Sequence, residues 1–350
     1  MCRNKQQKIL VIRNDKIGDF MLAWPSFALL KKQYPDAEIT ALVPEYTADL
    51  ARLCEWIDHV LIDERKNSFI SDIIHLKNNI ENGGFDTSIS LFSESRTSLA
   101  LWLAKVKQRI GPATKIAQVF LNDRLRQKRS ASLKPEYEYN LDLIKHFIKQ
   151  NGDTLSATPK PPFLCFDKNE IRQLRTQLRD KHAITEEQKI VIIHPGTGGS
   201  AINLSSEQYA ELVNKLRNKC NLYFIITAGP GERSHAKKLS NRIGDTTHYI
   251  HDSKSGIIEF CKLINTCDLF ISGSTGPLHI AGALNMPTVA FYPAKKSATS
   301  LRWQTINEKK LRLAFMPNKH TDDKDLQSIN IDECASIINN LLTRLYDAPN

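Results

Sequence analysis

Three short loops of this sequence combine glycines with side chains that can bind anions or move protons. The first, RNDKIGD, spans residues 13–19 and directly follows the apolar run KILVI. The second, HPGTGGSAIN, spans residues 194–203, and the third, SGSTGPLHIAGAL, spans residues 272–284. Each loop follows a run rich in β-branched residues and precedes a helical pattern, which predicts a strand-to-helix turn. In open α/β sheets, ligands bind at such turns, beyond the carboxyl ends of the strands.

The first loop carries two carboxylates, Asp15 and Asp19. Asp19 follows Gly18 where the helix is expected to begin, and the helix dipole favours the ionised form of a carboxylate at that position. Asp19 could contact a bound ligand at this position, because Gly18 has no side chain that would block the approach. It could equally be an ordinary helix N-cap, because aspartate is a preferred capping residue. Both interpretations remain open, and Asp15 is the next carboxylate to consider.

The glycine loop of residues 194–203 offers exposed amides and hydroxyls, and the positive end of the following helix adds to their attraction for phosphate. It lacks the GKS or GKT ending of a P-loop and does not match GxGxxG. A plain glycine-rich turn is the alternative interpretation.

The third loop places Pro277 and His279 in the first turn of the next helix, where proline is favoured and an imidazolium is disfavoured by the dipole. His279 on its own is also typical of a packing histidine. Between the two loops, Glu232 follows a Gly-Pro-Gly turn and could accept hydrogen bonds from ribose hydroxyls. A glutamate at a helix start is also an ordinary charge–dipole residue. Together the loops predict a nucleoside-diphosphate site.

Short apolar runs alternate with amphipathic stretches along most of the chain. In the first half we expect strands at residues 8–13, 38–43, 59–63 and 86–92, and helices at residues 19–34, 46–54, 68–82 and 96–104. In the second half we expect strands at residues 189–194, 222–229, 247–251, 268–272 and 287–292, and helices at residues 205–218, 231–243, 255–266, 276–285 and 331–346. The proline-rich stretch 157–166 predicts a linker between the halves. The alternation predicts two doubly wound parallel α/β domains that face each other across a cleft.

Composition is that of an ordinary globular protein, with 350 residues and a net charge of +10. The length favours two domains. Basic residues are dense in residues 105–115 and 124–134. Such runs are either a solvated surface or a surface for an anionic partner, such as nucleic acid or an acidic membrane or glycolipid. No nucleic-acid recognition motif accompanies them, so we expect no nucleic-acid partner.

The seven cysteines form no CxxC pair and the ten histidines show no ligand spacing, so neither a disulfide framework nor a metal site is predicted. No apolar run reaches the ~18 residues that a membrane-spanning helix needs. The N-terminal residues MCRNKQQ contain no signal-peptide core, and a cytoplasmic location is therefore expected.

The motifs at residues 17–19 (IGD), 194–201 (HPGTGGSA), 228–232 (AGPGE) and 273–284 (GSTGPLHIAGAL) resemble those of the bacterial lipopolysaccharide heptosyltransferases, glycosyltransferase family nine. The resemblance spans nearly the whole chain, and its last motif is the most specific part. It implies a GT-B fold, with an acceptor-binding domain at residues 1–160 and a nucleotide-sugar-binding domain at residues 161–328. It also implies that a C-terminal helix within residues 329–350 packs back on the first domain.

The resemblance also implies roles for individual residues. Asp19 matches the candidate general base of an inverting, metal-independent transfer. The implied donor-binding residues are Thr197, Gly198, Gly199, Glu232, Ser274, Thr275, Gly276 and His279. The candidates on the acceptor side are Arg13, Asp15, Lys16 and Gly18. No cofactor is implied beyond the nucleotide-sugar substrate.

Two departures from the family pattern concern the donor. Family members commonly continue the glycine loop with a basic residue and a Trp-Pro pair, where this chain has Ile202, Leu204 and Ser205. Arg13, Lys16 and Arg233 are the cations that could replace the missing one. Ser274 also stands where several heptosyltransferases carry an acidic residue.

The resemblance implies transfer of a heptose or related sugar, from ADP-heptose, to a lipopolysaccharide core or related glycan. The acceptor would be an anionic glycolipid at the inner leaflet, so a peripheral association with the cytoplasmic face of the membrane is expected. The departures at residue 202 and beyond keep open a catalytically impaired sugar-nucleotide binding protein of the same fold. A nucleotide-sugar epimerase is a third alternative, and its catalytic carboxylates differ.

Overall fold

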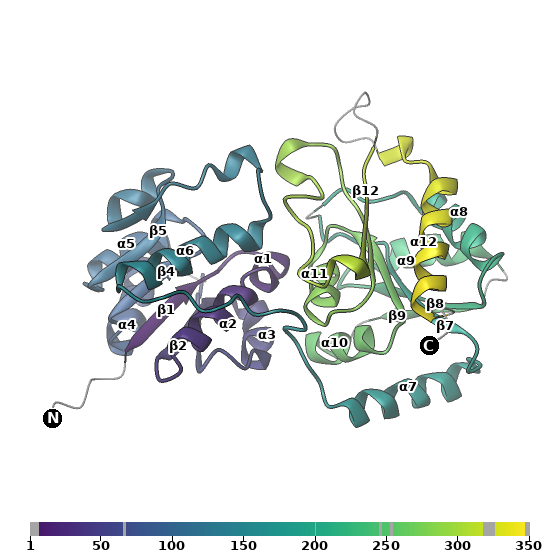
Figure 1. Cartoon of the computed structure of the whole chain (residues 1–350), viewed down its shortest axis with the longest axis horizontal. Coiled ribbons are helices and arrows are strands. Elements are labelled where there is room, and N and C mark those ends of the chain that lie inside the picture. The colour runs from purple at the N-terminus through teal and green to yellow at the C-terminus, as the bar shows by residue number, and fades with distance from the viewer. Residues whose placement is uncertain are drawn as a thin grey trace. The chain divides into compact units, whose positions relative to one another are not determined.

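The computed structural model describes residues 7–65, 68–199, 201–244, 247–252, 255–317 and 326–346. The chain forms two compact units, which divide after Phe163, inside the expected linker. Each unit is built on a six-stranded sheet in which every neighbouring pair is parallel (Figure 1). The predicted pair of doubly wound α/β domains is therefore confirmed.

The first sheet has the order β3-β2-β1-β4-β5-β6. Its strands are β1 (Lys8–Ile12), β2 (Glu38–Val43), β3 (His59–Ile62), β4 (Thr87–Ser90), β5 (Gln108–Pro112) and β6 (Asp123–Leu125). Its α-helices are α1 (Ile17–Met21), α2 (Trp24–Gln33), α3 (Ala48–Leu53), α4 (Phe69–Gly83), α5 (Ser95–Leu103) and α6 (Glu136–Gln150). A short 3-10 helix, η2 (Ile116–Phe120), packs against α5.

The second sheet has the order β12-β11-β10-β7-β8-β9. Its strands are β7 (Lys189–His194), β8 (Leu222–Ala228), β9 (His248–Asp252), β10 (Leu269–Gly273), β11 (Thr288–Phe291) and β12 (Arg312–Phe315). Its α-helices are α7 (Lys168–His182), α8 (Ser206–Arg217), α9 (Arg233–Ile243), α10 (Ile257–Asn265), α11 (Gly276–Ala283) and α12 (Ile331–Tyr346). Counted from β7, this strand order repeats the order of the first sheet.

Both sheets therefore reverse their strand order next to their first strand. The reversal lies between β1 and β4 in the first unit and between β7 and β10 in the second. A doubly wound sheet binds its ligand where the order reverses, because the loops on either side diverge there. The three loops singled out in the sequence follow β1, β7 and β10. The topology thus places all three at the expected ligand positions of their own sheets.

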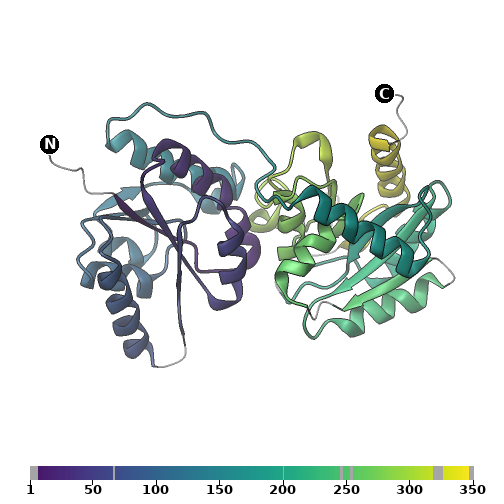
Figure 2. The same ribbon diagram turned by 90° about the horizontal axis from the view of Figure 1, so that it is seen from below.

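Helices cover both faces of each sheet, and the core lies between the layers (Figures 1 and 2). The central strand β1 is fully buried from Ile9 to Ile12, as expected for a parallel strand that is covered on both sides. Each such side chain contributes roughly 1.5–3 kcal/mol by leaving water. The strands that carry the site loops are thus held rigidly. Within the described residues, every helix is too short or too polar to cross a bilayer.

The C-terminal helix α12 belongs to the second unit. Its buried side chains, among them Ile338 and Leu342, join the apolar cluster that also contains Leu212 of α8. The Tyr346 hydroxyl donates to the carbonyl oxygen of Asp268 at 2.8 Å. The expected packing of residues 329–350 on the first domain stays a prediction. The apolar stripe of α12 already fits the neighbouring helix of its own unit.

Candidate functional site

A buried arginine at the end of β1 holds three carboxylates. Arg13 is 2% exposed, and its Nη2 donates to Asp19 Oδ1 at 2.5 Å, while its Nε donates to Asp15 Oδ1 at 2.8 Å. Its Nη1 donates to Glu136 Oε1 at 3.0 Å. We name these four residues the Arg13 cluster. Because a guanidinium presents its N–H groups in one rigid plane, Arg13 fixes the direction of each carboxylate.

Asp19 lies in the first turn of α1, but it does not cap the helix. Lys16 occupies the N-cap position, and the helix has no side-chain capping hydrogen bond. The capping interpretation of Asp19 is therefore wrong, and its carboxylate instead accepts a hydrogen bond from Arg13. Gly18 is buried in the same turn and Lys16 is exposed. The turn thus brings together all five residues that the sequence assigned to it.

Burial is the dominant electrostatic effect in the Arg13 cluster. It raises the pKa of Asp19 above the usual value of a carboxyl group, and Arg13 opposes that shift. Burial likewise raises the pKa of Asp15, to about 7. We expected the helix dipole to favour the ionised form, so the direction of that expectation is wrong for Asp19. Removal from water outweighs the dipole here, and a carboxylate with a raised pKa is a stronger base.

Glu136 was not among the sequence-predicted residues. It begins α6, far along the chain from β1, and it also accepts a hydrogen bond from Arg129 Nη1 at 2.8 Å. Asn140, one turn later, accepts from Arg13 Nη1 at 3.1 Å and donates to the carbonyl oxygen of Leu22 at 3.2 Å. Helix α6 therefore clamps Arg13. No local pattern in the sequence could reveal a partner so distant along the chain.

In the second unit, the glycine loop curves around the carboxylate of Glu232. The amide of Gly198 donates to Glu232 Oε1 at 2.5 Å, and the amide of Gly229 donates to Oε2 at 3.2 Å. A Cβ atom at Gly196 would lie 2.1 Å from Oε2, so any larger residue there would push the Glu232 carboxylate aside. The Gly198 amide, in the loop predicted to bind phosphate, thus binds a carboxylate of the chain itself. Ser200 of the same loop lies outside the described residues.

His194, at the end of β7, was part of the motif but was not assigned a role. Its Nδ1 lies 2.9 Å from the Thr227 hydroxyl, and its Nε2 lies 3.5 Å from Glu232 Oε2. Burial lowers the pKa of His194 to about 4, although Glu232 opposes the shift. The imidazole is therefore neutral near pH 7, and it supports Glu232 without adding a positive charge.

Asn203 joins the two loops of the second unit. Its Oδ1 accepts from the Tyr209 hydroxyl at 2.6 Å, and its Nδ2 donates to the carbonyl oxygen of Pro195 at 3.0 Å. A Cβ atom at Gly273 would lie 2.8 Å from the Asn203 amide. The close approach explains the glycine at the end of β10. Sequence reasoning missed Asn203 because nothing in its own neighbourhood marks a contact with β10.

The loop after β10 leads into α11, with Thr275 at the N-cap position and Gly276 as the first helical residue. Pro277 lies in the first turn, as predicted. Ser274 is half-buried. His279 is buried, burial lowers its pKa to about 4, and its Nδ1 has no hydrogen-bond partner among the described residues. The prediction of a neutral His279 has the right direction, but burial is the cause.

The departures from the family pattern have structural roles here. Ile202 packs against the apolar core of the second unit, and Leu204 is buried within that core. Ser205 is the N-cap of α8, where its hydroxyl accepts from the Gln208 amide and the Gln208 side chain accepts from the Ser205 amide. This capping box fixes the start of the helix without proline. Of the cations considered as substitutes, Arg13 is engaged by its carboxylates and Arg233 pairs with Asp252 at 3.3 Å.

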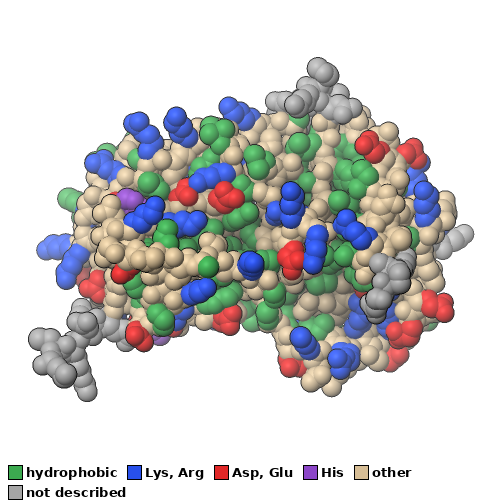
Figure 3. Space-filling view, viewed as in Figure 1, with side chains coloured by type: hydrophobic (Ala, Val, Ile, Leu, Met, Phe, Trp, Pro, Cys, Tyr) green, Lys and Arg blue, Asp and Glu red, His purple; other side chains and the backbone are tan. Residues whose placement is uncertain are grey.

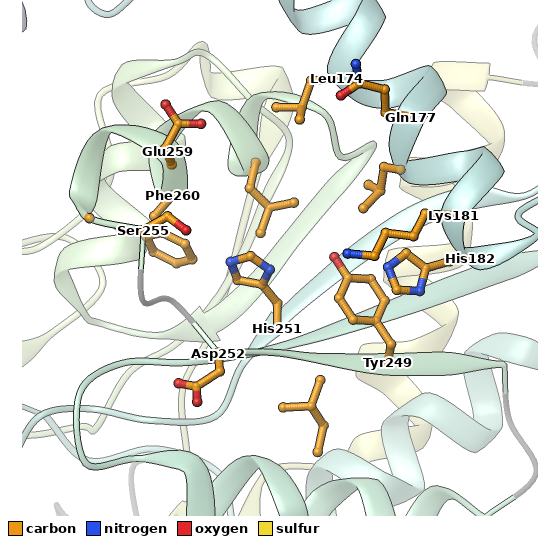
Figure 4. Close-up of a pocket in the computed structure, with 14 residues that line it drawn as sticks. Leu174, Gln177, Lys181, His182, Tyr249, His251, Asp252, Ser255, Glu259 and Phe260 are labelled. Carbon is orange, nitrogen blue, oxygen red and sulfur yellow. The ribbon is translucent and has the colours of Figure 1, made fainter.

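A cavity of about 510 Å³ lies beside this site, between α7, β9 and α10. Phe260 lines it, and the Phe260 ring centroid lies 6.2 Å from that of His194. The Tyr249 ring stacks on His182, with centroids 3.8 Å apart. Figure 4 shows the side chains of Lys181, Tyr249 and His251 directed toward the same space. The cavity therefore offers flat aromatic and imidazole surfaces next to the glycine loop.

Comparison with known proteins gives a consistent result. The family model described as glycosyltransferase family 9 (heptosyltransferase) matches residues 73–330. A Haemophilus influenzae protein, whose own description as a glycosyltransferase is provisional, is 41% identical over 98% of this chain and 99% of its own length. The lipooligosaccharide heptosyltransferase 2 of Campylobacter jejuni serotype O:2 is 23% identical, with 89% of each chain covered.

The solved structures show the same architecture. ADP-heptose lps heptosyltransferase II of Escherichia coli superimposes with a TM-score of 0.75 at 19% sequence identity, and the match covers 98% of this chain and 100% of that one. At this identity the likeness shows the fold alone. The predicted GT-B fold is thereby confirmed.

Proposed function

The chain belongs to glycosyltransferase family 9, and from this premise we propose that it transfers a heptose or a related sugar from ADP-heptose to a lipopolysaccharide core or related glycan. The observation that carries the proposal is the pair of polar sites at the strand reversals, one built around Asp19 and one around the glycine loop. The first site can accept a proton, and the second can hold an anionic donor.

Asp19 is the proposed general base. Its carboxylate would take the proton from an acceptor hydroxyl as that oxygen attacks the anomeric carbon. The new carbon–oxygen bond forms on the face opposite the departing nucleoside diphosphate, so the configuration inverts and no covalent intermediate forms. Arg13 holds Asp19 in one orientation at 2.5 Å, which leaves the second carboxylate oxygen for the acceptor. The buried surroundings raise the pKa of Asp19 and so strengthen it as a base.

The donor site would stabilise the charge of the leaving diphosphate with neutral groups. The amides of the glycine loop, the hydroxyls of Ser274 and Thr275 and the N-terminus of α11 are the proposed donors. Such fixed dipoles stabilise a developing negative charge without having to reorganise. This arrangement supports a reaction without a resident metal ion, as the family resemblance implies.

Glu232 would bind the ribose, and the neighbouring cavity would take the base. When ribose hydroxyls donate to Glu232, its carboxylate exchanges its bond with the Gly198 amide for a bond with the donor. That exchange would free the amide for phosphate. A planar base is suited to the cavity lined by Phe260 and Tyr249, because aromatic rings pack well against each other.

The proposed acceptor is an anionic glycolipid of the inner leaflet. An enzyme acting on it would work at the cytoplasmic face of the membrane, as a peripheral protein. The basic excess of the chain, +10 at neutral pH, supports such an encounter.

The test is release of nucleoside diphosphate by the purified chain. ADP-, UDP- and GDP-linked sugars would each be supplied with truncated lipopolysaccharide, with and without a chelator. We expect acceptor-dependent release of ADP that the chelator does not change. Binding of a donor without release under any acceptor would instead favour the sugar-nucleotide binding protein, and release that stops with the chelator would contradict the metal-independent reaction.

A further inference from the structure

Most of the net positive charge of this chain lies in one segment of the first unit. Residues 102–134 contain nine lysines and arginines and a single acidic residue, Asp123. Asp123 is paired with His146 at 2.5 Å. The remainder of the chain is close to neutral, since the whole chain carries +10. The segment therefore creates a positive electrostatic potential, because it contains too few acidic residues to neutralise its lysines and arginines.

The same segment exposes large apolar side chains. Ile116 and Val119 of η2 are 74% and 71% exposed, and Trp102 of α5 is 51% exposed. These two elements pack together, and the Trp102 ring centroid lies 6.1 Å from that of Phe120. The apolar side chains thus come from neighbouring elements and form one surface. Burying them within the unit would have been favourable, so their exposure needs a reason.

Lysines surround these apolar side chains. Lys105 follows α5, Lys107 precedes β5 with 84% of its side chain exposed, and Lys115 directly precedes η2. Figure 3 shows Lys and Arg side chains gathered over this part of the first unit, with hydrophobic side chains between them. We name the surface of Trp102, Leu103, Ile116 and Val119, with Lys105, Lys107 and Lys115, the α5–η2 face.

We propose that the α5–η2 face docks on the surface of an anionic lipid bilayer. The negative potential of an anionic leaflet attracts lysines. Aliphatic side chains lower their free energy by leaving water for the boundary between headgroups and acyl chains. Tryptophan is favoured at that boundary because its ring is both apolar and polar. A nucleic-acid surface would explain the lysines, but it would leave Ile116 and Val119 exposed to phosphate and water.

This inference deepens the proposed function, because a glycolipid acceptor is itself part of such a bilayer. The proposed function supplies the reason for membrane docking, but the evidence for docking does not depend on it. The docking itself can be measured without donor or acceptor, and transfer can be measured with a water-soluble acceptor. The two can therefore fail separately.

The experiment measures co-sedimentation of the full chain with vesicles. One set of vesicles contains phosphatidylethanolamine with phosphatidylglycerol, and the other contains phosphatidylcholine alone. We expect binding to the anionic vesicles only, and weaker binding as salt is added, because salt screens the attraction. Absence of binding to anionic vesicles at low salt would overturn the proposal.

Paired variants separate this face from general charge and general apolar exposure. K107E/K115E should weaken binding about tenfold or more, whereas K237E/K238E on α9 makes the same change in net charge and should weaken it much less. I116S/V119S should weaken binding several-fold, whereas I70S/I74S on α4, where Ile70 is 69% exposed, should not. Thermal unfolding checks that all four variants fold, as expected for exposed positions.

The outcomes are distinct. Equal losses in K107E/K115E and K237E/K238E would mean that net charge alone drives binding, which overturns the assigned face. Tight RNA binding that K107E/K115E abolishes, combined with vesicle binding that I116S/V119S leaves unchanged, would identify a nucleic-acid surface instead. Retained transfer to a soluble acceptor in every variant, with vesicle binding lost only in the α5–η2 variants, would support both proposals. Vesicle binding without any transfer would leave docking supported and contradict the proposed function.

Discussion

The two polar sites of this molecule are built from different kinds of chemical group. The Arg13 cluster consists of formally charged side chains that hold one another, with three carboxylates on one buried guanidinium. The second unit instead uses the backbone amides and the neutral His194 around Glu232, together with the N-terminus of α11 and the neutral His279 after β10. Both sites follow the same topology, since each lies where its sheet reverses strand order.

The difference reflects what each site has to do. A site that accepts a proton must change its charge during the reaction, so its pKa has to be set by burial and by neighbouring charges. A site that holds a diphosphate must keep fixed dipoles in place and has no need to titrate. The first site should therefore be sensitive to charge and pH, and the second to the addition of a few atoms.

The largest expected effect comes from removing the charge of Asp19. Asp19→Asn keeps the size of the side chain and an oxygen that can accept from Arg13, so folding should be preserved. Loss of the base should lower turnover by about 10²–10⁴-fold. Donor affinity should not change, because the proposed donor site lies in the other unit. The measurements are sugar transfer at saturating donor, donor titration and thermal unfolding.

Asp15→Asn is the matched control, since Asp15 is bound to the same guanidinium at 2.8 Å. We expect it to retain most of the activity. If instead Asp15→Asn abolishes transfer and Asp19→Asn does not, the two carboxylates have exchanged roles and Asp15 is the base. If neither substitution matters, the Arg13 cluster is structural and the comparison between the two sites fails.

The second prediction concerns pH. A base works only when deprotonated, so raised carboxyl pKa values move the loss of activity upward, toward neutral pH. Burial raises the pKa of Asp19 above its usual range and that of Asp15 to about 7. We therefore expect kcat/KM to fall about tenfold per pH unit below the apparent pKa of the cluster. Donor affinity should stay constant from about pH 5.5 to 8, because neutral histidines do not titrate in that range.

The two profiles can be measured with the same preparation, as kcat/KM for acceptor and as donor Kd by calorimetry. The fall in kcat/KM should persist in Asp15→Asn if Asp19 is the base. A donor Kd that follows the same pH curve as kcat/KM would show that one titration governs both sites. That result would show that the two sites do not differ in their dependence on pH.

The third prediction adds one carbon atom to the second site. In Gly196→Ala, the new Cβ would fall 2.1 Å from Oε2 of Glu232, so the carboxylate must move away. Glu232 is the end of a flexible side chain, and stability should change little. Donor affinity should fall by about tenfold, the value of one charge-assisted hydrogen bond. Gly229→Ala places its Cβ 2.9 Å from the same oxygen and should have a smaller effect.

A double-mutant cycle identifies the cause. In a Glu232→Ala background, Gly196→Ala should add little further loss, because the displaced carboxylate is already gone. Losses that multiply in the double variant would show that Gly196 acts on the donor directly. The effect of Gly196→Ala on donor affinity would then not depend on Glu232.

Local patterns in the sequence were sufficient for the strands and loops that carry the predicted site residues. Strands β1, β7 and β10 and their loops were predicted from two sequence patterns. A buried parallel strand appears as a continuous apolar, β-branched run, and the loop after it is rich in glycine. Strands β5, β6 and β12 and helices α6 and α7 were missed. Strands β6 and β12 lie at the sheet edges, where β6 begins with Asp123 and β12 with Arg312, so neither gives a clear apolar run.

Partners that are distant along the chain could not be predicted at all. The motif RNDKIGD suggests chemistry at Asp19, but nothing local indicates that Glu136 completes the cluster. In the same way, Asn203 gives no sign that it packs on Gly273. The direction of the pKa shift of Asp19 could not be predicted for the same reason. Burial depends on what packs around a side chain, and only the folded structure supplies that.

The smallest expected effect concerns the exit of the glycine loop. Ser205 stands where the family commonly has proline, and it starts α8 through a capping box with Gln208. Ser205→Ala removes the hydroxyl that accepts from the Gln208 amide at 3.2 Å, which should lower the free energy of unfolding by about 1 kcal/mol. Ser206→Ala, one residue later, is the matched control and should lower the free energy of unfolding by less.

Donor affinity should stay within about twofold in both variants, because Asn203 rather than the cap holds the loop against Pro195 at 3.0 Å. Urea denaturation and donor titration measure the two quantities. A donor affinity that drops together with stability in Ser205→Ala would show that the cap also positions the loop, and the second site would then depend on helix α8 as closely as the first depends on α6.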